Sequence, residues 1–301
     1  MYNPTWIVLE WYNSLWLEYE QLYNPRTFTE FDIGFHSRST FTNHLTVWFN
    51  TNFSPFNSFD YFEPRNDGWY YARPPMMDFS IGFSPDYRKK FVVDGNVGYW
   101  SSKRYEQNSY WFSVEPRFRV NDRLMIVYEF SYDHQKNDIG YVTDSTKADN
   151  ELAILFGKRN IDNYENVLEA NYRFSNKSSL AFRLRHYFIT LQYKDYYDLT
   201  RDGELAPSNY SAANDFSYNL FNIDMIYTWN FAPGSEINIV WKNAISSYEE
   251  AGALQTLENN IERDYLKNLK KTIETPATNS FSIKVLYYLD YQYLKRKDKK
   301  K

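Results

Sequence analysis

The chain has 301 residues, a formal charge of −4 and no cysteine, and its mean hydropathy is −0.68. The acidic balance argues against a nucleic-acid partner, and the lack of cysteine excludes disulfides, thiolate metal sites and a cysteine nucleophile. No stretch approaches the roughly 18 to 20 apolar residues of a membrane helix, yet aromatic residues make up 20% of the chain, as in a wall with one apolar and one polar face.

Apolar and polar residues alternate in many segments, which is the period of a β-strand. The alternation predicts strands at residues 5–21, 27–37, 41–53, 71–83, 88–101, 108–120, 123–133, 163–175, 178–193, 216–230, 235–246 and 279–293. The last is the clearest, because Phe281, Ile283 and Val285 fall on one face and Ser282 and Lys284 on the other.

The links between these strands alternate in length. Short links centre on Ser39, Pro85, Asn121, Asn176 and Pro233, and longer ones cover 22–26, 54–70, 102–107, 134–162, 194–215 and 247–278. The pattern predicts an all-β fold, a transmembrane antiparallel up-and-down β-barrel of about 12 strands (range about 10–14), with short periplasmic turns and long external loops. Both termini would then be periplasmic.

The two ends of the chain carry further expectations. Met1 to Trp6 lack the basic and apolar regions of an export signal, so we expect a mature fragment or one piece of a longer precursor. The barrel should span 1–294, followed by a basic tail over 295–301. This tail is either simply solvated or attracted to anionic headgroups.

Charges of both signs fall on the polar side of the predicted strands. Unpaired charge in a narrow lumen is costly, so we expect cross-strand ion pairs and a largely filled interior. The predicted network comprises Glu115, Arg117, Arg119, Glu129, Glu169, Arg183, Arg185, Asp224, Lys242 and Lys284. Alternatively, its two Arg-x-Arg pairs could form an anion-selective constriction.

Aromatic residues at strand ends, such as the pairs 99–100 and 110–111, predict girdles at the membrane interfaces. Those in predicted loops could bind a sugar or pack locally; they are Tyr61, Trp69, Tyr70, Tyr196 and Tyr197. Residues 257–271 predict a short amphipathic helix in the last external loop, which would cap the barrel, dock a partner or pack on the loop.

Catalytic signals are faint. The four histidines, His36, His44, His134 and His186, lie on separate segments, and no serine motif or metal-ligand spacing accompanies them. We therefore expect no catalytic residue, no metal and no cofactor.

Several segments resemble a known family. They are Gln-Leu-Tyr-Asn-Pro at 21–25, Asp-Tyr-Phe-Glu-Pro-Arg at 60–65, Asp-Tyr-Arg-Lys-Lys-Phe at 86–91, Phe-Ala-Pro-Gly-Ser at 231–235 and Lys-Val-Leu-Tyr-Tyr-Leu-Asp-Tyr at 284–291. Together they resemble the C-terminal β-barrel domain of a Bacteroidota outer-membrane family of unknown function. The resemblance implies an outer-membrane location and an N-terminal half similar to family 9 carbohydrate-binding modules, and it transfers no catalytic residue.

These observations lead to three functional hypotheses. The first is a non-enzymatic outer-membrane barrel that contacts lipid and lipopolysaccharide. It would anchor, or form part of, an envelope or glycan-handling complex, with envelope proteins or the N-terminal glycan-binding half as partners. The second is a narrow channel for small solutes or oligosaccharides. The third, an outer-membrane hydrolase, rests only on the existence of such barrels.

Overall fold

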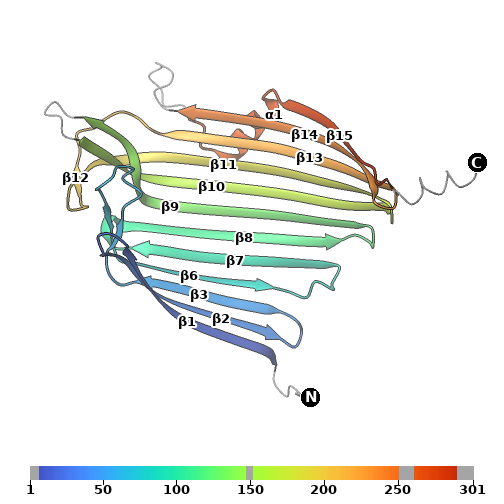
Figure 1. The fold of residues 1–301 in the computed structure, drawn as a ribbon, viewed down its shortest axis with the longest axis horizontal. Helices are drawn as coiled ribbons and strands as arrows, with labels where there is room; N and C mark the ends of the chain where they lie inside the picture. The colour runs from blue at the N-terminus through green and yellow to red at the C-terminus, as the bar shows by residue number, and fades with distance from the viewer. Residues whose placement is uncertain (1–6, 147–151, 251–260, 290–301) are drawn as a thin grey trace, which may run out of the picture.

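The computed structural model describes residues 7–146, 152–250 and 261–289. Twelve long strands form a single path in one antiparallel sheet (Figure 1). They are β1 (Val8–Leu22), β2 (Thr27–Phe41), β3 (Thr46–Ser54), β6 (Met76–Ser84), β7 (Phe91–Ser102), β8 (Gln107–Arg119), β9 (Leu124–Thr146), β10 (Leu152–Ser175), β11 (Ser178–Leu199), β13 (Phe216–Ala232), β14 (Ser235–Glu250) and β15 (Thr278–Leu286). The all-β class is confirmed, and the strands follow the predicted order, but the strand predicted at 71–83 is divided: residues 71–73 belong to a separate two-stranded sheet and the long strand begins at Met76.

The remaining elements are short. They are the hairpin strands β4 (Ser58–Asp60) and β5 (Tyr71–Arg73), the 3₁₀ turn η1 (Arg104–Glu106), strand β12 (Leu205–Pro207) paired with β11, and the helix α1 (Tyr265–Glu274). No helix in the described ranges is long and apolar enough to cross a bilayer.

The sheet is open in the described residues. Strands β1 and β15 each pair on one side only, with β2 and β14 respectively, so the expected closed ring is not seen. Both edge strands are consequently exposed along nearly their whole length. The basic tail at 295–301 and the last residues of the strand predicted to reach 293 lie outside the described part.

Side-chain alternation gives the sheet two distinct faces. Register alignment places Leu15, Phe49, Ile81, Ile239 and Phe281 on one face, which we call the apolar face. The opposite face, called the polar face, carries the charged residues. The apolar face is open to the surroundings on the inner strands as well as at the edges, because 37% of Phe49, 48% of Ile81 and 43% of Ile239 are exposed. Much of this apolar surface is therefore left uncovered by the described residues.

The turn that joins β2 to β3 lies a few residues later in the chain than predicted. β2 continues through Ser39 to Phe41, and the turn lies at 42–45, where His44 has φ of 60°. The other short links agree with the prediction. We call this side of the sheet the turn end, and the opposite side the loop end.

Strands β9 and β10 extend far beyond their predicted limits. The predicted loop at 134–162 is wrong, because β9 continues to Thr146 and β10 begins at Leu152. Bulges interrupt the pairing of the two strands between Leu155 and Phe156 and between Arg159 and Ile161, so the alternation breaks although the strands continue.

Residues 55–75, which we call the strap, connect β3 to β6 and include the β4–β5 hairpin. The strap reaches past β7 and β8 to the extended strands at the loop end (Figure 1). The Tyr141 backbone N–H donates to Glu63 Oε1 at 2.8 Å, and Ala72 N–H donates to the Gly203 carbonyl at 2.8 Å. A small core of buried residues joins strap and strands: Trp69, Tyr71, Ile139, Ile154, Phe156 and Leu199.

Candidate functional site

Ion pairs on the polar face follow the rows set by strand register. Glu169, Arg183, Asp224 and Lys242 stand opposite one another on β10, β11, β13 and β14. Arg183 Nε lies 3.3 Å from Glu169 Oε1, and Lys242 Nζ lies 3.4 Å from Asp224 Oδ1. The row alternates in sign across four strands, so the charges are balanced along the wall.

A second group of charges lies near the turn end. Arg117 pairs with Glu115 and, at 3.4 Å, with Asp94, and its guanidinium lies 4.7 Å from the ring centre of Tyr87. The Tyr87 hydroxyl donates to Asp94 Oδ1 at 2.7 Å. Arg117 is therefore held on three sides by the wall itself.

The structure also places the other members of the predicted network. Arg185 Nε lies 3.5 Å from Glu165 Oε1, and Glu129 accepts a 3.5 Å hydrogen bond from Ser131. Arg119 and Lys284 have no ion-pair partner within the described residues. The pairs that form join neighbouring positions on the wall.

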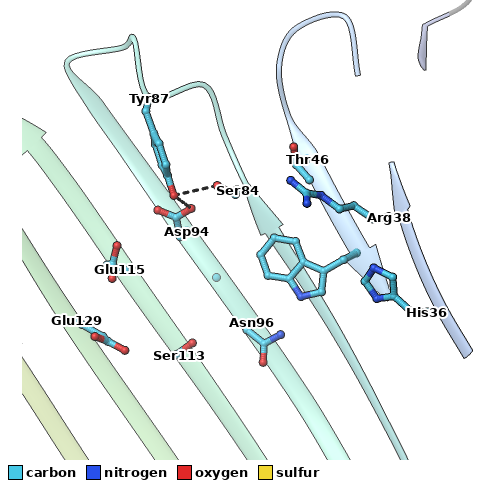
Figure 2. Close-up of a pocket in the computed structure, with 12 residues that line it drawn as sticks. His36, Arg38, Thr46, Ser84, Tyr87, Asp94, Asn96, Ser113, Glu115 and Glu129 are labelled. Carbon is cyan, nitrogen blue, oxygen red and sulfur yellow. Dashed lines mark hydrogen bonds between the residues drawn. The ribbon is translucent and has the colours of Figure 1, made fainter. Parts of the chain in front are cut away.

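The polar face carries an open pocket of about 540 Å³. Figure 2 shows His36 and Arg38, from β2, on one side of it and Asp94, Glu115 and Glu129, from β7 to β9, on the other. The pocket thus has a basic and an acidic flank. Such a surface suits a polar solute that offers both donors and acceptors.

A second pocket, of about 400 Å³, lies closer to the loop end. Its lining includes Trp100 and Trp111 together with the carboxylates of Asp78, Asp133 and Asp138. The prediction that both tryptophans belong to membrane girdles is wrong, because the register puts them on the polar face; Tyr99 and Tyr110 are the residues on the apolar face.

Each of three tryptophans on the polar face covers a glycine directly opposite on the next strand. Trp16 lies over Gly34, Trp48 over Gly82 and Trp111 over Gly98, and a Cβ added to any of these glycines would overlap the indole. These pairs were not predicted, although each glycine stands inside a predicted strand, a position that often marks the close approach of another group.

The loop aromatics divide into two groups. Trp69 is 5% exposed within the strap core and lies under the Arg201 guanidinium at 3.9 Å, and Tyr197 packs against the same core. Tyr61 contacts Tyr70, and Tyr196 stacks on Tyr193 with ring centres 5.5 Å apart. The buried position of Trp69 gives it a packing role, whereas the other rings are partly exposed.

Two ionisable groups at the loop end are displaced in pKa. Burial raises the pKa of the Tyr71 hydroxyl. Burial lowers the pKa of Arg159, but Asp138 and Tyr193 raise it more, so the net pKa is raised; Arg159 Nε lies 2.8 Å from Asp138 Oδ2. Tyr71 is therefore held in its neutral form and Arg159 in its ionised form within the packed structure at the loop end.

The histidines do not form a common site. His36 lies on the polar face beside Asn50, whereas His134 pairs with Asp162 and His186 with Asn219 on the apolar face. None of these three is bonded to a serine. Within the described residues no group of three or more histidines and carboxylates has the geometry of a metal site.

The family model of DUF5916, a domain of unknown function, matches residues 1–298. The chain belongs to this family. Its predicted resemblance to a family of unknown function is thereby confirmed. No curated protein matches the chain.

Among solved structures, the chain is similar to a copper transporter, OprC, with a TM-score of 0.56 and 13% sequence identity. The likeness covers 94% of this chain and 43% of the transporter, so the chain spans less than half of that protein's length. At this identity the comparison shows the fold alone, namely a large antiparallel sheet.

Proposed function

We propose that this DUF5916 chain forms the lipid-embedded wall of a closed β-barrel in a bacterial outer membrane, and that the barrel is a non-enzymatic component of the envelope. The observation that carries the proposal is the exposed apolar face, whose large exposed side chains run from Leu15 on β1 through Ile81 on β6 and Ile239 on β14 to Phe281 on β15. In water such a face would drive association. Outer-membrane lipid and lipopolysaccharide would cover it instead.

The sheet also has the connectivity that closure requires. Its path contains an even number of strands with antiparallel neighbours throughout, so β1 and β15 run in opposite directions and can pair. In a bilayer an unpaired edge leaves backbone N–H and C=O groups in hydrocarbon, at a cost of several kcal/mol each. Closure through β1 and β15 removes both edges, and both termini then lie at the periplasmic turn end.

Cysteine pairs test this closure, because the chain contains no native cysteine. Leu15 or Leu17 on β1 would be combined with Ile283 or Val285 on β15, four apolar-face positions, and oxidised in proteoliposomes. We expect one register to give an intramolecular disulfide, since cross-strand neighbours have suitable Cα separations. Pairing of Leu15→Cys with Phe49→Cys, on β3, is the negative control. Reaction between two chains but not within one would contradict closure in this form.

The envelope role adds a support function. The resemblance implies a carbohydrate-binding-like half ahead of the barrel, and we propose that the barrel anchors that half or an envelope complex. Affinity purification of the full-length protein in detergent, followed by glycan-array binding, tests this. A lone monomer without glycan binding, whose deletion leaves envelope assembly and glycan use unchanged, would oppose it.

A second candidate, a narrow solute path, is favoured by the two open pockets on the polar face. Their indole rings and carboxylates suit a saccharide, because rings stack on the apolar faces of sugars while carboxylates accept from hydroxyl groups. Planar-bilayer recording with and without oligosaccharide tests it. Discrete conductance that oligosaccharide blocks, and blocks less in Trp100→Ala, would support the solute path. Bilayers that show no conductance would oppose it.

A further inference from the structure

Helix α1 lies against the apolar face of the sheet. Asn166 Nδ2 donates to the Tyr265 hydroxyl at 2.8 Å, and the rings of Tyr164 and Tyr265 stack with centres 4.8 Å apart. Further along the helix, Asn219 donates to the Thr272 hydroxyl. The register places Asn166 and Asn219 on the same face as Leu168 and Ile223, so α1 crosses β10, β11 and β13 on the side proposed to face lipid.

The part of the sheet beneath α1 carries buried polar groups beside its aromatic rings, unlike the rest of the apolar face. His186 and Asn219 are 2% and 3% exposed and bond to each other at 2.9 Å. The helix presents polar groups to them, since Asn268 and Thr272 are its buried residues. Packing between α1 and the sheet therefore satisfies hydrogen bonds and leaves the apolar side chains of Leu266 and Ile273 exposed.

Those apolar side chains point in a defined direction. Lys271 pairs with Glu249, which lies one residue from the loop end of β14, so this side of the helix faces the loop end. At 3.6 residues per turn, Leu266 and Ile273 lie about 140° and about 160° around the helix from Lys271. Both side chains therefore project toward the turn end, over the apolar face. Leu266 is 72% exposed and Ile273 is 65% exposed.

We propose that α1 is an interfacial helix that lies along the outer boundary of the bilayer and inserts Leu266 and Ile273 among the acyl chains of membrane lipid. The inference rests on the proposed function, because it needs the apolar face to be in lipid. Continuity supports it, since the two side chains extend the exposed band of the wall. Lys267 and Lys270 lie on the side away from the sheet, where they face anionic headgroups.

Single cysteines carrying nitroxide spin labels test the placement, because the native chain offers no competing thiol. Leu266→Cys, Ile273→Cys, Lys267→Cys on another side of α1, and Ile239→Cys on the apolar face would each be reconstituted in bilayers. Power saturation then compares access of oxygen, which concentrates in lipid, with access of a water-soluble nickel chelate. All four side chains are on the surface, so the variants should fold, and heat-modifiable migration in gels checks this.

We expect labels at 266, 273 and 239 to favour oxygen several-fold over the nickel chelate, and the label at 267 to favour the chelate. Labels at 266 and 273 in water, with 239 in lipid, would overturn the interfacial helix while leaving the barrel standing. A label at 239 in water would overturn the barrel itself. Immobile labels at 266 and 273 that neither reagent reaches would mean that a protein covers α1, which also overturns the inference.

Discussion

Trp111 lies over Gly98, its direct partner across the β7–β8 pair. A Cβ at position 98 would overlap the indole, so Gly98→Ala must displace it, and we expect a loss of about 1–3 kcal/mol in the free energy of unfolding in urea. The Gly98→Ala/Trp111→Ala double variant should lose less than the sum of the two single variants. Ser113→Ala, on the same face, is the control. Strictly additive losses of unfolding free energy would show that the position of the Trp111 ring does not depend on Gly98.

Reversal of one charge should disturb the row that runs from Glu169 to Lys242. Arg183→Glu would stand beside Glu169 and opposite Asp224, so repulsion replaces attraction. Both partners are nearly half exposed, so we expect the loss to stay near about 1 kcal/mol and to shrink at high salt. Urea unfolding at two ionic strengths measures it, with Arg173→Glu on the same face as control. An effect that does not change with salt would argue against a Coulombic origin.

The strap should open when its buried indole is removed. Trp69→Ala deletes the ring between the strap core and Arg201, at a local cost of about 3–5 kcal/mol. Limited proteolysis should then cut within residues 55–75 much faster than in the unmodified chain. The sheet should remain folded, as shown by unchanged heat-modifiable migration in gels. Phe62→Ala, at an 87% exposed position on the same strap, should change little. Equal protease resistance of the two variants would mean that Trp69 does not hold the strap.

The polar patch under α1 should be needed to hold the helix in place. Asn219→Leu removes the partner of both His186 and Thr272, and unpaired buried polar groups cost about 1–3 kcal/mol each. Hydrogen exchange at the amides of 265–274 should accelerate. Asn222→Leu, on the polar face of the same strand, should leave this exchange unchanged. Unaltered protection in Asn219→Leu would place the anchoring of α1 elsewhere.

Strand positions were predictable from sequence because the two faces of the sheet meet different surroundings. The alternation at 281–285 and its counterparts on the other strands record that difference directly. The alternation fails where β9 extends past the apolar side chains toward the loop end. There Lys136, Asn137 and Asp138 have the composition of a turn, and Asn137 has φ of 57°, although the strand continues. The loop at 134–162 was predicted wrongly for this reason.

The site was less predictable than the fold. Glu169 with Arg183, and Asp224 with Lys242, pair as expected, because both members of each pair fall on the polar side of adjacent strands. The glycine partners of Trp16, Trp48 and Trp111 depend on register, which a single sequence does not contain. The position of α1 was also hidden, since the fully buried residues of the helix are Asn268 and Thr272 and not its leucines. The predicted helix at 257–271 overlaps α1 at 265–271, and 257–260 lie outside the described residues.

The extended β9–β11 strands and the strap form a packed projection at the loop end. Its surface brings together side chains from the strap, from β9 and from the β11–β12 turn, which are distant in sequence. An antibody or phage tail fibre that recognises this projection should therefore bind the folded protein and fail on boiled samples. Escape variants should then map to strap-core positions such as Trp69, as well as to the contacted surface.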